Sequence, residues 1–231
     1  MIVALDIETI GNPDAVVLMP DPEVKTGNLK DPAKIAGKKA EAKAEMLSKA
    51  ALDPLTARII CYAAAAGEIC GEEKDVSEII AEATDTAERR LVQAIMRMLG
   101  VDDVRIVTWN GIGFDLPMIY KRAMILGVDP GSFGAPPLSA WTKRYSTDRH
   151  YDLMQIWGGW SSMGFAKLDT VAGLVLHEHK TYGIDVTTFA DVMQTEAGRA
   201  KIAAYCLQDT RLTWRLWKRF NGVMFQQLVT K

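Results

Sequence analysis

Two acidic residues one position apart, Asp6 and Glu8, lie at the end of the first apolar segment of the chain, residues 2–7. The segment is short and apolar, which is typical of a buried strand, and alternation along a strand sends both carboxylates to the same face. Two adjacent carboxylates repel each other unless they face solvent or divalent cations neutralise them. The pair is therefore either a solvated strand end or part of a metal site.

A third acid, Asp115, belongs to the segment WNGIGFDLP at residues 109–117, where a predicted strand ends and a helix begins. Asn110 followed by glycine suits the tight turn between them. Helix capping, which contributes roughly 1 kcal/mol, explains an aspartate near a helix start. Capping leaves Asn110 and Phe114 without a special role.

The fourth acid, Asp209, follows Tyr205 by four residues in the segment AAYCLQDTRLTW. Residues at i and i+4 of a helix share one face, so the phenol and the carboxylate project together. Taken alone, the pair also fits a polar stripe with a tyrosine at its edge. The combination of the three segments is what favours a joint chemical role.

The elements that must position these side chains follow from hydrophobic periodicity and from glycine and proline signals. Strands are predicted over residues 2–7, 58–66 and 104–109, with a hairpin return through 69–70; helices over 32–51, 86–99, 115–126, 152–157, 167–176 and 196–220; and loops over 11–32 and 131–137. This order predicts one α/β domain, residues 1–231, built on a mixed sheet with helices on both faces. A lysine-rich loop and helix, at about 11–55, form an insertion beside the core.

Composition describes an ordinary globular protein of 231 residues, with 48% hydrophobic and 24% charged residues. No apolar run reaches membrane-spanning length and the N-terminus has no secretory pattern, so we expect a cytoplasmic protein without membrane contact. Three cysteines, Cys61, Cys70 and Cys206, match no zinc or CxxC spacing and are predicted to be reduced packing residues.

The net charge of −2 argues against an electrostatic grip on nucleic acid by the whole molecule, but charge is unevenly distributed. Seven lysines against four acids lie between residues 23 and 49, and residues 211–219 also carry four basic side chains. Each run is either a solvated helix face or a rim that contacts phosphates.

Taken in order, Asp6-Ile7-Glu8, Asn110 with Phe114-Asp115, and Tyr205 with Asp209 resemble the three motifs of DEDD-type 3'-5' exonucleases, tyrosine subclass, which have a ribonuclease H-like fold. The stretch RYSTDRHYDLMQIW with the later KLDTVAGLVL resembles predicted exonucleases related to the proofreading domain of family-B DNA polymerases. The resemblance covers residues 1–10 and most of 57–219. It departs at residues 176–180, where LHEHK replaces the usual glycine or proline before lysine; we expect His177 and His179 to be surface loop residues.

The resemblance implies a two-metal-ion hydrolysis of phosphodiester bonds at the 3' end of DNA, with Mg²⁺ or Mn²⁺ as cofactors. The expected substrate is single-stranded DNA. It implies that Asp6 bridges two ions, that Glu8 and Asp209 complete the site of the nucleophile's metal, and that Asp115 holds the second ion. Tyr205 is expected to orient the attacking water. Contacts to the terminal nucleotide are expected from Thr9, Asn110 and Phe114.

Three alternatives stay open on the sequence. The same four acids serve exoribonucleases, so RNA is a competing substrate. The chain could keep the fold as a non-catalytic nucleic-acid-binding module, although all four acids and the tyrosine are present. It could also act as a proofreading subunit with a replication or repair protein as partner. The lysine-rich insertion fits either a strand clamp or a partner-binding surface.

Overall fold

The structure is a computed structural model that describes residues 1–25, 27, 31–67, 73–181 and 183–225. Its strands are β1 (Ile2–Gly11), β2 (Ala57–Gly67), β3 (Glu73–Ile79), β4 (Arg105–Thr108) and β5 (His150–Asp152). The longer helices are α2 (Pro32–Ser48), α3 (Asp85–Leu99), α4 (Asp115–Leu126), α7 (Leu168–Leu176) and α9 (Glu196–Phe220). The shorter ones are α1 (Pro13–Leu18), α5 (Leu138–Trp141), α6 (Leu153–Trp157) and α8 (Phe189–Val192).

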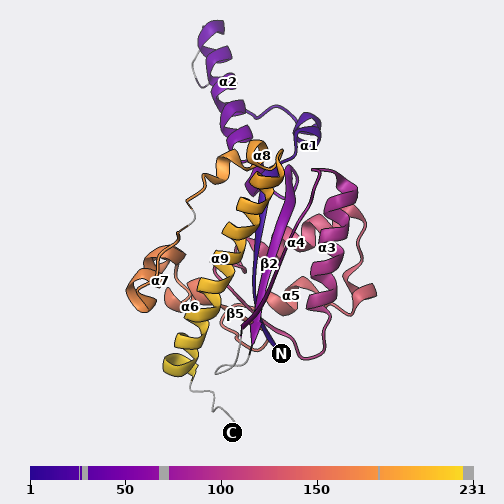
Figure 1. The fold of residues 1–231 in the computed structure, drawn as a ribbon. Helices are drawn as coiled ribbons and strands as arrows, with labels where there is room; N and C mark the ends of the chain where they lie inside the picture. Colours follow the sequence, from indigo (N-terminus) through magenta and orange to yellow (C-terminus); the bar gives the residue numbers. More distant parts are fainter. Residues whose placement is uncertain (26, 28–30, 68–72, 182, 226–231) are drawn as a thin grey trace.

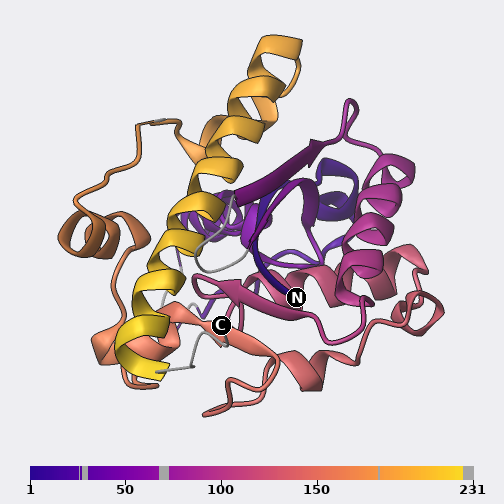
Figure 2. The same ribbon diagram turned by 60° about the horizontal axis from the view of Figure 1, so that its bottom comes forward.

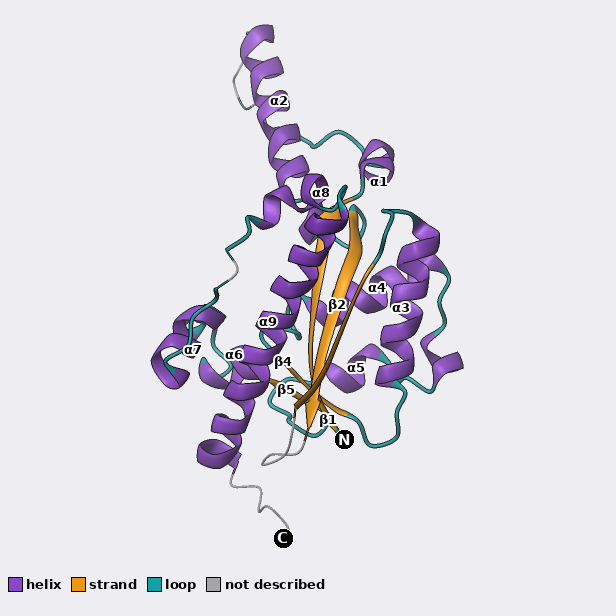
Figure 3. Ribbon diagram, in the orientation of Figure 1, coloured by secondary structure: helices purple, strands orange, loops and turns teal. Residues whose placement is uncertain are grey.

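The five strands form one twisted sheet in the order β3-β2-β1-β4-β5 (Figures 1 and 3). Pairing is antiparallel between β3, β2 and β1, and parallel between β1, β4 and β5. The mixed sheet predicted from the sequence is therefore confirmed. Strand β1, which carries Asp6 and Glu8, lies at the centre of the sheet.

Helices cover both faces of the sheet, as Figure 2 shows with α3 and α4 on one side and α9 on the other. The first core packs α3 and α4 against β1 residues such as Val3 and Leu5. The second core packs α7 and α9 against Ala4 and Val107 on the opposite face. Alternation along β1 thus divides its side chains between two apolar layers, and Asp6 and Glu8 share the parity of Ala4, on the α9 side.

A buried ion pair fixes α4, whose first residue is Asp115, against α3 and the sheet. Glu88 of α3 accepts hydrogen bonds at 2.8 and 2.6 Å from Arg122 of α4 and one at 2.9 Å from the backbone N–H of Ile59 in β2. Glu88 and Arg122 are buried. Because an unpaired charge at this depth is strongly unfavourable, the pair constrains how α4 can sit.

Several element predictions need correction. Residues 150–152 form strand β5, whereas the sequence predicted a helix that begins at residue 152. The strand forms because His150 pairs with Ile106 of β4, and three residues are too few to show an alternating hydrophobic pattern. The predicted loop 11–32 contains helix α1, and α5 and α8 were not predicted. The hairpin is confirmed through β3, but the predicted return at 69–70 lies outside the described residues.

The lysine-rich insertion forms α1 and α2, and neither helix has a buried residue. Figure 1 shows α2 projecting beyond the end of the sheet. Exposed ion pairs join Lys43 to Asp21 and Lys49 to Glu45, as a solvated helix would show. The single-domain boundary and the role of the insertion stay predictions. Within the described residues, no helix combines the length and the apolar character that a bilayer crossing requires.

Candidate active site

The two acids of β1 lie on the face of the sheet that α9 covers. Asp6 pairs in register with Ala63 and Glu8 with Cys61 of β2, and a register shift follows directly after Glu8. Strand β4 pairs with β1 only over residues 2–4, so among the described residues the β4-side edge of β1 has no strand partner from residue 5 onward. That open edge leaves room for another element beside the acids.

The turn between β4 and α4 fills this room. Asn110 adopts a left-handed conformation with φ of 74°, which asparagine tolerates better than most residues. A Cβ atom on Gly111 would lie 2.3 Å from Thr108 Oγ1, so only glycine fits there. The fully buried Asp152, at the end of β5, accepts hydrogen bonds from the backbone N–H groups of Asn110 at 3.1 Å and Ile112 at 2.8 Å. Sequence reasoning missed this positioning role of Asp152.

Asp115 is brought to β1 by that turn. Burial raises the pKa of Asp115 to about 7, with the Asp152 carboxylate also raising it, while hydrogen bonds from its own backbone N–H and from that of Ile7 oppose the rise. The bond to Ile7 places the carboxylate at the open edge of β1, next to Asp6 and Glu8. Asp115 is therefore a buried acid of the site and not an exposed helix cap.

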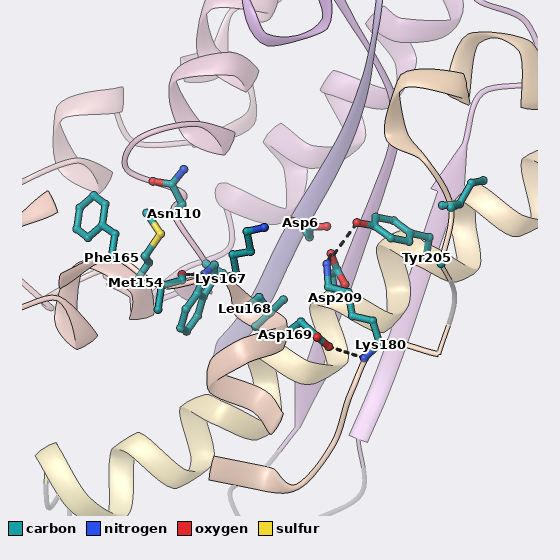
Figure 4. A pocket seen from close by; sticks show the side chains of 14 residues that line it. Asp6, Asn110, Met154, Phe165, Lys167, Leu168, Asp169, Lys180, Tyr205 and Asp209 are labelled. Carbon is teal, nitrogen blue, oxygen red and sulfur yellow. Dashed lines mark hydrogen bonds and ion pairs between the residues drawn. The ribbon is translucent and has the colours of Figure 1, made fainter. Parts of the chain in front are cut away.

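Helix α9 supplies the remaining acid. Its close approach to the sheet is possible because β2 presents small side chains such as Ala63, and Thr210 Oγ1 donates a 3.4 Å hydrogen bond to the Ala63 carbonyl. Tyr205 and Asp209 project toward Asp6 from successive turns (Figure 4). Between them Cys206 is buried, with its Sγ 3.7 Å from Asp6 Oδ2.

Asp6 and Glu8 lie close enough to the other carboxylates to be perturbed by them. Burial raises the pKa of Asp6 well above its usual value, and Glu8, Asp115 and Asp209 raise it further. Burial also raises the pKa of Glu8, with Asp209 and Asp115 adding to the effect. The four acids predicted from three separate segments therefore form one cluster. Its negative charges are not fully neutralised by the basic groups beside it.

Lys180 supplies part of the missing charge, and sequence reasoning did not select it. Its Nζ lies 2.5 Å from Asp209 Oδ2 and 3.3 Å from the Tyr205 hydroxyl. Burial lowers the pKa of Lys180, but Asp209 and Tyr205 outweigh it, so the pKa is raised overall. The only sequence signal was its place after the LHEH loop, where the resembling family also has lysine. His177 and His179 are exposed, as expected.

A pocket of about 730 Å³ opens over the cluster. One end holds Asp6 and Asp209 with Tyr205 and Lys180, the other is lined by apolar side chains, and Lys167 lies between the two ends (Figure 4). Glu8 and Asp115 do not line the pocket. The full lining is Asp6, Trp109, Asn110, Met154, Phe165, Ala166, Lys167, Leu168, Asp169, Lys180, Gly183, Ile184, Tyr205 and Asp209. The apolar end was not predicted, because the segments that supply Met154, Phe165 and Leu168 carry no residue selected as a candidate site residue.

The three residues predicted to contact a nucleotide differ in position. Asn110 lines the pocket. Phe114 does not line it and packs against the α3–α4 core. Thr9 is buried, and its hydroxyl donates a 2.7 Å hydrogen bond to the Ala51 carbonyl of the insertion. Of the three, Asn110 is the one that lines the pocket, and contact with a nucleotide stays a prediction.

The cluster fits hard divalent cations. Asp209 Oδ1 is buried without a hydrogen-bond partner, although the other oxygen of this carboxylate is engaged by Lys180. Ligand atoms of Asp6, Glu8 and Cys206 lie within 4.8 Å of one another. Burial raises the pKa of the Cys206 thiol well above its usual value, so it stays protonated and the donors are carboxylate oxygens. Oxygen donors are what Mg²⁺ and Mn²⁺ prefer. Cys61 and Cys206 are buried free thiols, whereas Cys70 lies outside the described residues.

Among solved structures, the chain is similar to the family B DNA polymerase of the archaeon Pyrobaculum calidifontis, with a TM-score of 0.62 at 20% identity. The match covers 95% of this chain and 24% of the polymerase. The likeness confirms the ribonuclease H-like α/β fold that the motifs implied. At this level of identity it speaks for the fold alone.

Among curated proteins, the chain is 26% identical over 144 residues to a DNA polymerase of Thermococcus litoralis and 26% identical over 145 residues to one of Pyrococcus glycovorans. Each match covers 58% of this chain, but only 8% and 18% of the respective polymerases. Residues 52–229 match a family model described as a predicted 3'-5' exonuclease related to the exonuclease domain of PolB. The match includes Asp115, Tyr205 and Asp209 and covers well over half of the sequence. The chain therefore belongs to this family of predicted 3'-5' exonucleases related to the exonuclease domain of PolB.

Proposed function

We propose that the protein is a metal-dependent 3'-5' exodeoxyribonuclease that hydrolyses the last phosphodiester bond of a single-stranded DNA 3' end. The observation that carries the proposal is the convergence of four acids beside an open pocket: Glu8, Asp115 and Asp209 all raise the pKa of Asp6, and Asp6 and Asp209 line the pocket. Phosphodiester hydrolysis needs charge neutralisation that this cluster can recruit. The similarity to DNA polymerases favours DNA over RNA.

Asp6, Glu8, Asp115 and Asp209 would hold two divalent ions, Mg²⁺ or Mn²⁺. Bound ions of this kind lower the pKa of a water molecule and stabilise charge on the leaving oxygen. The protein's own contribution is to fix the ligands, since Asp6 and Glu8 are on the central strand and Asp209 is on the long helix packed against it. The buried, unpartnered Oδ1 of Asp209 supports a ligand role for this residue.

Tyr205 would orient the attacking water. Burial and the Asp209 carboxylate raise the pKa of Tyr205 from 10.0 despite the opposing effect of Lys180, so its hydroxyl is protonated at neutral pH. It can therefore donate and accept hydrogen bonds but cannot act as the general base. An edge-on contact with Phe189, 5.8 Å between ring centroids, holds the ring in place.

The pocket supports a single-stranded substrate. Its apolar end, with Phe165 and Met154, offers packing for a base or sugar, which tolerates any sequence. Asn110, at the same end, could hydrogen-bond the terminal nucleotide. Phe114 and Thr9 have other partners, so we assign them no contact with substrate.

The test is digestion of single-stranded DNA labelled at the 5' or the 3' end, with Mg²⁺, Mn²⁺ or EDTA. We expect a ladder that shortens from the 3' end, an immediate release of 3' label as mononucleotide, and no product in EDTA. A matched RNA oligonucleotide and a blunt duplex, run alongside, measure sugar and strand preference. Release of 5' label as mononucleotide, or hydrolysis that is unaffected by EDTA, would rule out the proposal.

Replacing Tyr205 by Phe tests the water-orienting role. The ring and its contact with Phe189 remain, and only the hydroxyl is lost, so we expect turnover to fall roughly 10- to 100-fold, the effect of a misplaced reactant. Calorimetric titration with Mn²⁺ should give unchanged affinity. Tyr145→Phe, at an exposed position, is the control. Turnover equal to that of the unmodified protein would mean that the hydroxyl does not orient the water.

A further inference from the structure

The pocket has an acidic wall and a basic wall that come from different parts of the fold. Asp6 on β1 and Asp209 on α9 belong to the acidic wall. The basic wall is formed by the segments that flank α7, with Lys167 before the helix and Lys180 after it, and it also holds the carboxylate of Asp169 in the first turn of α7. These are the two cations among the described residues that line the pocket.

The two lysines differ in their contacts. Lys180 is engaged by Asp209 and Tyr205, so its charge is used within the protein. Lys167 is exposed, and its ammonium group makes no hydrogen bond or ion pair with the residues that the structure describes. Figure 4 shows its side chain extending into the middle of the pocket, between Asp6 and the end formed by Phe165 and Met154.

The backbone of Lys167 is firmly anchored although its side chain has no partner. The indole N–H of Trp109, directly after β4, donates a 3.1 Å hydrogen bond to the carbonyl of the preceding residue, Ala166. The carbonyl of Lys167 itself accepts the first-turn bond of α7 from Val171 at 3.2 Å. Asp169 accepts a 2.7 Å bond from the backbone N–H of Lys180 and so joins the two ends of the basic wall. These hydrogen bonds fix the backbone at Lys167, and its side chain extends from there into the pocket.

We propose that Lys167 is a positioning residue that binds a non-bridging oxygen of the 3'-terminal phosphodiester. The inference rests on the proposed function, because that function places this phosphate beside Asp6. A lysine ammonium is a compact charge suited to phosphate, and it is not drawn into an ion pair with the acidic wall. An ordinary solvated surface lysine would also be exposed, but it would not need a backbone anchored at the wall of the pocket.

The experiment measures binding separately from hydrolysis. Variants Lys167→Ala and Lys167→Arg are compared with Lys121→Ala, an exposed lysine of α4 that does not line the pocket. Fluorescence anisotropy with a 5'-labelled oligothymidylate in EDTA gives the Kd at several salt concentrations. One oligonucleotide is unmodified, and a second carries an uncharged methylphosphonate at its 3'-terminal linkage.

For Lys167→Ala we expect about tenfold weaker binding, typical of a lost charged hydrogen bond. The slope of log K against log salt should fall by about 0.7, as for one phosphate of a single strand. The methylphosphonate should weaken binding of the unmodified protein and of Lys121→Ala, but should have no further effect on Lys167→Ala. Lys167→Arg should restore most of the affinity. With Mn²⁺ present, Lys167→Ala should mainly raise KM.

An unchanged Kd and salt slope in Lys167→Ala would overturn the inference, as would an equal effect of the methylphosphonate on this variant and on the unmodified protein. Failure of the proposed function would give a different result. In that case neither the unmodified protein nor any of its lysine variants would hydrolyse DNA in Mn²⁺, whatever their Kd values. Hydrolysis by the unmodified protein with normal binding by Lys167→Ala would reject the role of Lys167 alone.

Discussion

Replacing Asp6 or Asp209 by Asn is expected to abolish hydrolysis while the protein stays folded. Each substitution keeps the size of the side chain and removes one negative charge from the proposed ion-binding cluster. If the bound ions supply about 4 kcal/mol or more of transition-state stabilisation, the rate falls at least about 10³-fold. Asp209→Asn also removes the ion-pair partner of Lys180, so the effect of Asp6→Asn is the simpler one to interpret.

The measurement compares initial rates on 5'-labelled single-stranded DNA with the circular dichroism spectrum and the melting temperature of each variant. Asp102→Asn, an exposed acid in the loop before β4, is the matched control and should keep its full rate. Normal turnover by either folded Asp6→Asn or Asp209→Asn protein would refute the assignment of these residues. If an active-site variant failed to fold, its circular dichroism spectrum would differ from that of the Asp102→Asn control.

Divalent cations are expected to stabilise the protein strongly, and more so at pH 8 than at pH 5. In the metal-free protein, burial raises the pKa of Asp115 to about 7 from 3.8. The folded state therefore binds this proton more tightly than the unfolded chain, and stability falls as pH rises from about 4 to about 7. Above pH 7 the penalty is complete, on the order of 4 kcal/mol for this group. Ions held by the four carboxylates would remove it.

The melting temperature should accordingly rise by roughly 5–10 °C when Mn²⁺ is added at 100 times its Kd at pH 8, the effect of about 2.7 kcal/mol of binding on a chain of this size. Asp115→Asn keeps the shape of the side chain without its charge. In EDTA at pH 8 this variant should be more stable than the unmodified protein, and the difference should shrink toward pH 4. A metal-free protein whose stability increases between pH 4 and pH 7 relative to Asp115→Asn would contradict the prediction.

Local features of the site could be predicted because they depend only on the repeat of a single element. Alternation in β1 places Asp6 and Glu8 on one face, and the helical repeat places Tyr205 and Asp209 on one face of α9. The bounds of α9, residues 196–220, agree with the predicted helix because its apolar pattern is long and regular. The motifs, taken together, also indicated the family, which the match over residues 52–229 then established.

Other features depend on contacts between residues distant in sequence. Lys180 meets Asp209 across 29 residues, and Asp152 holds the turn at Asn110 across 42. The periodicity of a single strand or helix cannot predict contacts between residues so far apart in the sequence. Thr9 directly follows Glu8 and Phe114 directly precedes Asp115, yet the register shift after Glu8 and the packing of α4 give them other partners.

By itself, the sequence determined which acids share a face of a strand or helix, because side-chain direction follows from the backbone repeat. The tertiary structure alone decided that these faces meet at one pocket and that a basic wall lies opposite them. The physical reason is that β4 pairs with β1 only as far as residue 4, which leaves that edge of β1 open, and that small side chains on β2 let α9 approach. Both depend on how complete elements pack against one another.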